Sequence, residues 1–282
     1  MHLDKRIFTF WAQGFGNAPR IVKACLEQMV ALNPKWDVMA LDEDSVRDHC
    51  PEKPVDDQIW QSLGRAHQSD LLRTQLLIEH GGVWMDPTVY CVRPLDDWLP
   101  QQMAGGVFFF QKPGRDRLIS NWFIAAEPNN LLLRKLIDRL CEFWKETGSE
   151  SGFSIPSVPQ SLLIRALSRH HRLSRWRVRS PWRRLFSEPA YMVYHYLLCD
   201  LVLTDAEAKA IWHRVPEVSA VPPHRLQRLG LTAAVTMEGE RLLAGSESPL
   251  FKLTWKNLPL DPAPDTLLAR LYCHPQQATA DV

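Results

Sequence analysis

The hydrophobic residues of this chain recur with two different periods, which predicts strands alternating with helices. Residues 6–13 are rich in β-branched and aromatic side chains and predict a first strand, and residues 36–42 predict a second. Between them, Pro19 suits the first turn of a helix that we expect to end near Leu32. This β-α-β order indicates a parallel sheet and a protein of the α/β class.

Farther along, the pattern continues to alternate and then becomes mainly helical. Residues 66–80 predict a helix that ends at Gly81. An amphipathic helix begins at Asn129 or Asn130 and ends near Gly148, and helices are expected again from residue 160 to about residue 213. Three more strands are predicted over residues 82–86, 107–111 and 120–126.

The composition adds few restrictions. With 282 residues, 45% of them hydrophobic and 23% charged, and a formal net charge of +1, the chain can form a large core, and its overall charge indicates no particular partner. The six cysteines form no C-x-x-C pair, so we expect reduced thiols and no zinc site of that spacing. No apolar stretch approaches the roughly 18 residues of a membrane span, so we expect a cytoplasmic protein that does not cross the membrane.

Two polar residues of the helix over residues 66–80 are candidates for a binding site. Asp70 and Arg73 are three positions apart, so they share one face of the helix. A double glycine then joins the helix to a strand that ends at Asp86, and ligands of open α/β sheets gather beyond such strand ends. The residues leave an alternative open, in which Asp70 and Arg73 form a surface ion pair and Asp86 only begins a turn.

The segments SDLLR (residues 69–73) and GGVWMDPTV (residues 81–89) resemble the core of the capsular polysaccharide synthesis protein family. They are also similar to the wider group of sugar transferases with a D-x-D motif, which includes mannosyltransferases and glucosylating toxins. The resemblance is expected to cover most of the chain, from FWAQGFGNAPRIVKACLEQMVALNPKWDVMALDEDSV through SNWFIAAEPNNLLL to LFKLTWK. It implies a GT-A type fold, which is an α/β fold with a Rossmann-like mixed sheet flanked by helices, and a mainly helical C-terminal portion.

The resemblance implies a single GT-A-like glycosyltransferase domain over residues 1–260. Residues 1–126 would bind the nucleotide-sugar, residues 127–260 would form a mainly helical acceptor side, and residues 261–282 would be a partly disordered tail. The implied activity is transfer of a hexose from a nucleotide-sugar, with a UDP-sugar expected first, to a hydroxyl of a glycan or lipid-linked acceptor in capsule or other surface polysaccharide synthesis. Related families retain the anomeric configuration, while the residues themselves leave inversion open.

The resemblance also implies roles for residues of the first strand and the central motif. Trp11 and Gln13 would lie at the nucleotide end of the first strand. Asp70 and Arg73 would contact ribose, donor sugar or phosphate, and Asp86 would stand for the first acid of the D-x-D motif.

Thr88 replaces the second acid of that motif, which usually binds the metal. A divalent metal, Mn²⁺ or Mg²⁺, is implied by the family, yet a threonine hydroxyl is a weak and neutral ligand. His195 is the candidate for a replacement ligand beside Asp86 and Thr88, although a histidine on an aromatic helix is more often a core residue. Trp84 shares a strand face with Asp86 and Thr88 and is grouped with the donor-binding residues.

Two further stretches supply candidates for donor binding. The FKLTWK stretch offers ammonium, hydroxyl and indole groups suited to the charge on a leaving diphosphate, from Lys252, Thr254, Trp255 and Lys256. The alternative is that this stretch has no role in binding and is a strand that ends in a solvated lysine. Asn121, at an expected strand end, would bind sugar hydroxyls, and Trp122 would stack on a sugar or belong to the core.

The segment from Arg165 to Arg184 contains eight arginines among twenty residues and no acid. Most such runs are solvated faces, but Trp176 and Trp182 among the arginines favour contact with an anionic membrane or acceptor. No RNA- or DNA-recognition motif accompanies the run, so we expect no nucleic acid partner. The rival to an enzyme is a non-catalytic protein of GT-A fold that binds an anionic glycan or lipid through this segment.

Overall fold

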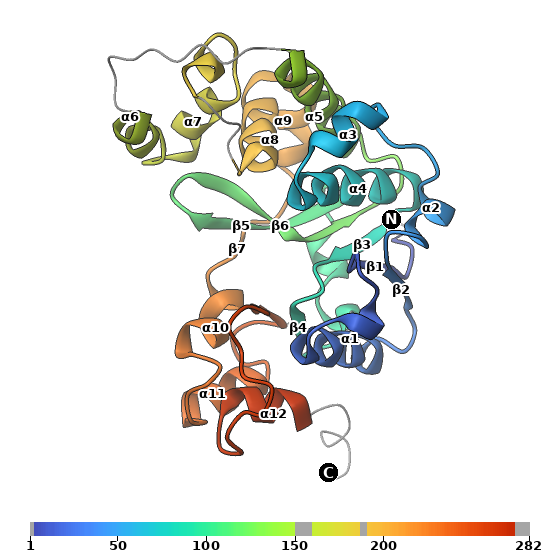
Figure 1. Ribbon diagram of the computed structural model, residues 1–282, viewed down its shortest axis with the longest axis vertical. Coiled ribbons are helices and arrows are strands. Elements are labelled where there is room, and N and C mark those ends of the chain that lie inside the picture. Colours follow the sequence, from blue (N-terminus) through green and yellow to red (C-terminus); the bar gives the residue numbers. More distant parts are fainter. Residues whose placement is uncertain (1–2, 150–159, 187–190, 274–282) are drawn as a thin grey trace.

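A six-stranded sheet lies at the centre of the computed structural model, which describes residues 3–149, 160–186 and 191–273 (Figure 1). In the order of the sheet, the strands are β2 (Asp37–Leu41), β1 (Arg6–Phe10), β3 (Gly82–Met85), β6 (Arg117–Ala126), β5 (Val107–Gly114) and β7 (Val218–Ser219). Strands β2, β1 and β3 are parallel, β6 is antiparallel to both β3 and β5, and β7 is parallel to β5. The predicted mixed sheet of the α/β class is confirmed.

Helices cover both faces of this sheet. Above it in Figure 1 lie α3 (Asp57–Ser62), α4 (Arg65–His80), α5 (Leu131–Ser149), α8 (Val193–Thr204) and α9 (Ala206–Trp212). Below it lie α1 (Arg20–Leu32), α10 (Arg225–Leu229), α11 (Met237–Leu243) and α12 (Leu267–Cys273). Shorter elements toward the edges are α2 (Val46–His49), α6 (Gln160–Leu167) and α7 (His171–Ser174). The helices expected after residue 160 are therefore present in the described residues.

The described residues also form short 3-10 helices. They are η1 (Phe15–Asn17), η2 (Leu95–Asp97), η3 (Pro100–Gln102), η4 (Arg175–Arg177), η5 (Trp182–Leu185) and η6 (Pro222–His224). None of the helices in the described ranges has the length and apolar character needed to cross a membrane.

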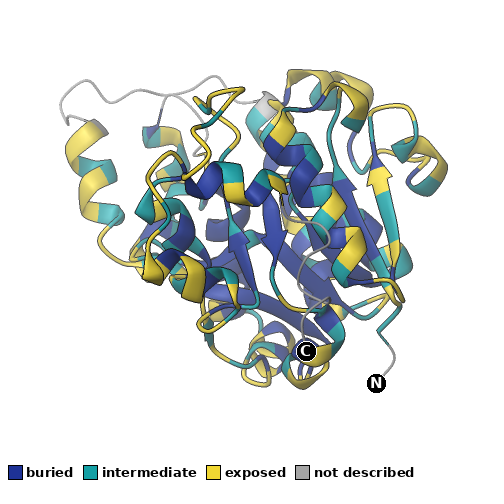
Figure 2. Ribbon diagram, turned by 90° about the horizontal axis from the view of Figure 1, so that it is seen from below, coloured by how far each residue is buried: buried dark blue, intermediate teal, exposed yellow. Residues whose placement is uncertain are grey.

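The alternation of side chains along the strands explains how two cores form. Phe8, Trp84 and Ile124 lie in register on neighbouring strands, and all three pack toward α4, α5 and α8. The residues before the first two, Ile7 and Val83, belong to the core on the opposite face. Figure 2 shows the consequence, because the central strands are dark blue along most of their length. The sheet is thus buried on both faces, as expected for strands covered by helices.

A second, two-stranded sheet joins two segments that are far apart in the sequence. Strand β4 (Val89–Cys91) pairs with β8 (Leu250–Lys252) in antiparallel register, so that Val89 faces Lys252. The sequence did not predict β4. It also placed residues after 260 in a partly disordered tail, which is wrong for α12, because Leu267, Leu268 and Leu271 are buried in the same core as part of α1. Residues 274–282 lie outside the described residues.

Strands β5 and β6 are longer than the sequence predicted. They form one hairpin, and β6 begins at Arg117, three residues before the expected start. Asn121 and Trp122 therefore lie within the strand and not at its end, which corrects their predicted position. The predicted helix start is confirmed, because the Asn130 Oδ1 accepts hydrogen bonds from the backbone N–H groups of Leu132 and Leu133 at 3.1 and 3.4 Å.

Candidate active site

The side chain of Arg73 links three segments of the chain. Its guanidinium lies 3.5 Å from Asp70 Oδ1 and 3.5 Å from Asp86 Oδ1. It also donates hydrogen bonds to the backbone oxygen of Asn121 and, at 3.0 Å each, to the backbone oxygen and Oγ of Ser69. Both Asp70 and Arg73 are 5% exposed, so the alternative of a surface ion pair is wrong. The prediction that Asp70 and Arg73 lie close to Asp86 is therefore confirmed.

Three groups hold the carboxylate of Asp86 from different sides. The Trp84 indole donates to Oδ1 at 3.0 Å, on the same oxygen that Arg73 approaches. The Lys252 ammonium lies 3.2 Å from Oδ2 and also donates to the hydroxyl of Thr88. Trp84 is 1% exposed, and the Arg73 guanidinium lies 4.9 Å above its ring. Trp84 therefore orients Asp86 from the protein side, whereas the sequence placed it on the donor-binding surface.

Asp70 is fixed by a similar set of contacts. The Asn121 amide donates to its Oδ1 at 2.7 Å, which occupies the group that we expected to bind sugar hydroxyls. Trp122, the next residue of β6, is 6% exposed and stacks on Phe110 with ring centroids 5.1 Å apart. The alternative in which Trp122 belongs to the core is therefore confirmed, and the residue also lines a cavity, whereas its stacking on a sugar stays a prediction.

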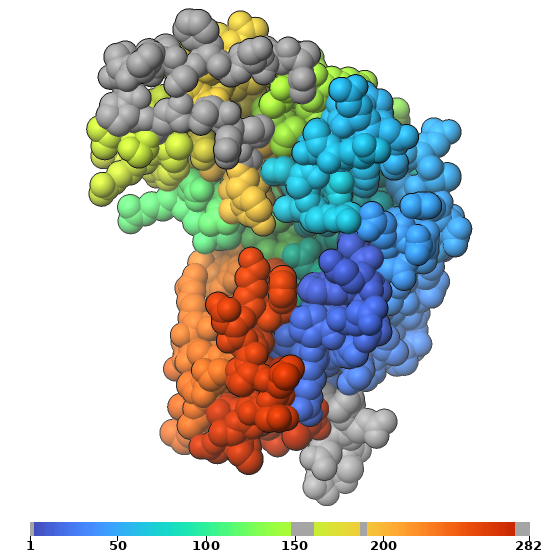
Figure 3. Space-filling view, viewed as in Figure 1, coloured from blue at the N-terminus to red at the C-terminus, as the bar shows by residue number. Residues whose placement is uncertain are grey.

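A polar cavity of about 170 Å³ opens beside these carboxylates. Its lining includes six residues singled out from the sequence, namely Asp70, Arg73, Asp86, Asn121, Trp122 and His195. In Figure 3 the blue, cyan, yellow and red segments surround a recess on one face of the molecule. The lining also includes Arg117 and His224, which the sequence analysis missed. Arg117 follows the hairpin turn and His224 follows a Pro-Pro pair, and neither spacing carries a recognisable motif.

Two histidines line the cavity, His195, which is buried, and His224, which is partly buried. Burial lowers the pKa of His195 to about 3, with further lowering by Arg117 and Arg73. Burial also lowers the pKa of His224 to about 4, and the positive charges of Lys252, Arg228 and Arg117 lower it further. Both imidazoles are therefore neutral near pH 7. The Nδ1 of His195 is buried without a hydrogen-bond partner among the described residues, so it can pair with a group of a ligand.

The three residues expected to hold a metal do not form a suitable ligand set. Within the described part of the chain, no three His, Cys, Asp or Glu side chains are grouped as a metal site requires. The Lys252 ammonium contacts both Asp86 and Thr88, so a cationic group already lies against the two expected oxygen ligands. His195 contributes one neutral nitrogen to the cavity, and hard divalent cations prefer oxygen ligands. Asp86, Thr88 and His195 therefore do not fit Mn²⁺ or Mg²⁺ in this arrangement.

The remaining donor-binding candidates lie around the end of β1. Trp11 and Trp255 meet edge to face, with ring centroids 5.5 Å apart, although they are far apart in sequence. Trp255 is 44% exposed, and the Lys256 ammonium lies 5.8 Å from its ring centroid. The backbone N–H of Thr254 is held by a hydrogen bond of 2.9 Å to a glutamine side chain. Gln13 is exposed and does not line the cavity beside Asp86.

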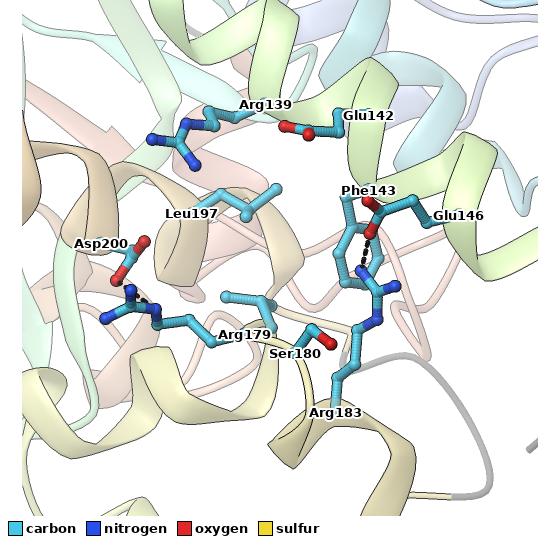
Figure 4. A pocket seen from close by; sticks show the side chains of 10 residues that line it. Arg139, Glu142, Phe143, Glu146, Arg179, Ser180, Arg183, Leu197 and Asp200 are labelled. Carbon is cyan, nitrogen blue, oxygen red and sulfur yellow. Dashed lines mark ion pairs between the residues drawn. The ribbon is translucent and has the colours of Figure 1, made fainter. Parts of the chain in front are cut away.

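The arginine-rich segment is partly used inside the fold. Arg175 pairs with Asp200 of α8 at 2.8 Å, and Arg179 approaches the same carboxylate at 3.6 Å. Figure 4 shows Arg179 and Arg183 pointing inward, where Arg183 pairs with Glu146 of α5. The segment is therefore no uniform solvated face. Exposed arginines remain in and beside α6 and α7, at Arg165, Arg169 and Arg172.

The N-terminal half of the chain matches a known protein family. Residues 1–153 fit the family described as capsular polysaccharide synthesis protein. The chain belongs to this family. The match ends at residue 153, so the LFKLTWK segment lies outside it, whereas the resemblance was expected to cover most of the chain.

Two curated relatives of the chain are named as glycosyltransferases. The chain is 28% identical over 171 residues to O-glycosyltransferase braB of Annulohypoxylon truncatum, covering 53% of this chain and 40% of the relative. It is 32% identical over 104 residues to Glycosyltransferase afumC of Aspergillus fumigatus, covering 33% and 26%. The chain thus spans less than half the length of these relatives.

Two solved structures are similar to a large part of the chain. The UDP-bound glycosyltransferase domain of the YGT toxin is 9% identical, with a TM-score of 0.49 and coverage of 78% of this chain and 80% of that one. PaToxG glycosyltransferase is 14% identical, with a TM-score of 0.43 and coverage of 88% and 89%. Similarities at this level define no residue correspondence.

Loss of the Arg73 guanidinium should destabilise the fold. Arg73→Ala leaves the carboxylates of Asp70 and Asp86 without their shared partner, and breaking a buried ion pair in this way costs about 3–5 kcal/mol. Arg65→Ala on the same helix is the control, because Arg65 pairs with Glu43 on the surface and such pairs are worth about 0–1 kcal/mol. Urea unfolding of the two variants measures the difference. Equal losses in both variants would show that Arg73 is no structural link.

His195 should make the protein less stable as the pH falls below its ordinary pKa. The unfolded chain protonates this imidazole near pH 6.5, whereas the folded protein holds its pKa at about 3. Protonation therefore favours unfolding as the pH falls from 6.5 toward 3, and the contribution is fully present above 6.5. Between about pH 7 and pH 5, wild type should lose roughly 2 kcal/mol more than His195→Gln. Denaturant unfolding at both pH values tests this, and parallel losses would contradict it.

Proposed function

We propose that the protein is a glycosyltransferase of GT-A type that moves a hexose from a nucleotide-sugar to an acceptor hydroxyl. The observation that carries the proposal is the link from Asp70 through Arg73 to Asp86, at the carboxyl end of β3 and on the wall of a polar cavity. Ligands of α/β sheets bind at that edge. Membership in the capsular polysaccharide synthesis family and the names of the curated relatives support the same chemistry.

The charges around the cavity suit a donor with a diphosphate. Arg73, Arg117 and Lys252 are three cationic side chains at or beside the cavity, and Asp70, Asp86 and Asp116 are the carboxylates that pair with them. Cationic groups stabilise negative charge on a departing diphosphate in a site of low dielectric. The cavity of about 170 Å³ is below the roughly 300 Å³ typical of ligand pockets, so it suits one sugar ring rather than a whole donor.

The nucleoside would then lie outside this cavity. Trp11, which is partly buried, and Trp255, which is 44% exposed, form an aromatic pair at the end of β1, the strand next to β3. Aromatic faces of this kind bind bases by stacking. We propose a UDP-sugar as the donor and assign its base to this pair, its diphosphate to Lys252 and its sugar to the cavity near His195.

The contacts of Asp70 and Asp86 argue against a covalent sugar intermediate on either carboxylate. A covalent sugar intermediate needs a carboxylate free to attack. Asp70 is held by Asn121 and Arg73, and Asp86 is held by Trp84, Arg73 and Lys252. Because the families that the chain resembles retain the anomeric configuration, we propose that the acceptor hydroxyl attacks the same face that the diphosphate leaves. The acceptor would be a glycan or lipid-linked hydroxyl in capsule or related surface polysaccharide synthesis.

Replacement of Asp86 tests the catalytic proposal. A screen of nucleotide-sugars should find a donor from which the wild-type protein releases nucleoside diphosphate, and Asp86→Asn should lower that rate by roughly 100-fold or more. Asp57→Asn is the matched control, because Asp57 pairs with Lys53 on the surface and does not line the cavity. Full activity in Asp86→Asn would remove this residue from the site. Absence of donor turnover together with tight glycan binding would instead favour the non-catalytic alternative.

The exposed part of the arginine-rich segment supports a second, peripheral role. Leu162 and Leu173 are 60% and 42% exposed beside Arg165, Arg169 and Arg172. Exposed arginines attract anionic headgroups by about 1 kcal/mol each, and apolar side chains enter the interface. We propose that α6 and α7 rest on the anionic inner face of a membrane, where a lipid-linked acceptor would be found.

Binding to anionic vesicles tests this contact. Wild type should co-sediment with vesicles rich in phosphatidylglycerol at low salt and be released at high salt, because exposed charges are screened. The test variant changes Arg165, Arg169 and Arg172 to glutamine and should lose this binding while keeping donor hydrolysis. The control changes three other exposed arginines, Arg47, Arg214 and Arg241, and should still bind. Equal loss in both variants would mean that net charge, and not this surface, causes the binding.

A further inference from the structure

The ammonium group of Lys252 occupies the place between the two residues of the D-x-T motif. It lies 3.2 Å from Asp86 Oδ2 and donates to the hydroxyl of Thr88. These are the two side chains that a D-x-D motif would turn toward a divalent cation. The backbone fixes this position, because β8 pairs Lys252 with Val89. In addition, the backbone N–H of Leu253 donates to the backbone oxygen of Thr88 at 2.9 Å.

We propose that Lys252 is a built-in cation that takes the place of a divalent metal at the donor diphosphate. The inference rests on the proposed function, since it assigns the charge that balances the leaving group. In the transfer, the bond from the anomeric carbon to the diphosphate oxygen breaks and its electron pair stays on the diphosphate. The acceptor oxygen forms the new bond to carbon, and its proton passes to the departing diphosphate. Lys252 donates to the diphosphate oxygen as that charge develops.

The Lys252 side chain is accessible enough for this role. The side chains of Lys252 and Asp86 are 21% and 22% exposed, so both are anchored in the protein and open toward solvent at one side. An ammonium has three donors, and Asp86 and Thr88 account for two of them. One donor therefore remains for an oxygen of a ligand. The charge of Lys252 also reaches His224, a residue of the cavity wall, because it is the second cause, after burial, of the lowered pKa of that imidazole.

The identity of Thr88 agrees with a lysine at this place. A neutral hydroxyl can accept one hydrogen bond from the ammonium without adding charge. Asp86 then balances Lys252, while Arg73 is shared between Asp86 and Asp70. A divalent ion bound to Asp86 would be close to two cationic side chains, and like charges at such distances repel strongly in a partly buried site. The threonine is thus part of a site for a lysine cation, and its presence does not indicate a lost catalytic acid.

Direct metal binding is the first test, because it needs no donor. Mn²⁺ is titrated into the full chain and free Mn²⁺ is followed by electron paramagnetic resonance. Wild type should bind no Mn²⁺ at the site, whereas the double variant Thr88→Asp, Lys252→Ala should bind it, since it has two carboxylates and no ammonium. Tight binding of Mn²⁺ to wild type that Asp86→Asn removes would overturn the inference.

Donor hydrolysis is the second test and is measured with the nucleotide-sugar found by the screen. Wild-type activity should be the same in EDTA and in Mn²⁺. Lys252→Met should lose roughly 10²–10³-fold, and Lys252→Arg should recover at least about a tenth of the wild-type rate because it restores the charge. The control is Lys5→Met, which removes a lysine paired with Asp96 at 2.7 Å outside the cavity and should keep full activity. Thermal unfolding shows that each variant is folded.

The outcomes separate this inference from the proposed function. Wild-type hydrolysis that stops in EDTA and returns with Mn²⁺ keeps the glycosyltransferase and overturns the role of Lys252. A folded Lys252→Met variant as active as Lys5→Met overturns it as well. If wild type neither hydrolyses any nucleotide-sugar nor binds UDP or GDP, with or without metal, the proposed function fails and this inference fails with it.

Discussion

One buried guanidinium holds the candidate active site together. Arg73 is 5% exposed and contacts two carboxylates and a strand oxygen, so it joins α4 to the end of β3 and to the middle of β6. A buried charge is unfavourable without partners, and here each carboxylate also has its own neutral donor, Asn121 for Asp70 and Trp84 for Asp86. Because every partner depends on the others, the position of Asp86 relative to the cavity is fixed before a ligand arrives.

The connection between α4 and β3 makes this contact geometrically feasible. Gly81 and Gly82 both have positive φ, at +64° and +89°, and a Cβ on Gly82 would lie 2.5 Å from the backbone oxygen of Arg6. Only glycine permits so close an approach of the strand to its neighbour β1. The helix can therefore end directly against the sheet, and the side chain of Arg73 reaches the far end of the short strand at Asp86.

Local patterns predicted the elements near this contact well. The helix before the double glycine and the strand after it could be predicted, because the residues that define them lie within a short stretch of the sequence. The burial of Arg73 was not readable, since it depends on Asn121 of a hairpin whose length the sequence underestimated. The Pro-Pro pair before His224 gave no reason to place that residue in the cavity. The apolar side chains of residues 267–273 share a core with distant elements, namely α1, β4, α10, α11 and β8, so no local pattern predicted this helix.

The pairing of β4 with β8 has a consequence for the order of folding. Lys252 and Thr88 are 164 positions apart, and contacts between such distant residues form slowly because a long loop must close first. The central sheet from β1 to β6 can be complete before β8 has left the ribosome. The last component of the cluster then arrives when β8 docks beside β4. A truncated chain that ends before residue 250 would keep Arg73 and both carboxylates but lack the ammonium of Lys252 beside Asp86, so the complete site can form only after the chain has been synthesised through β8.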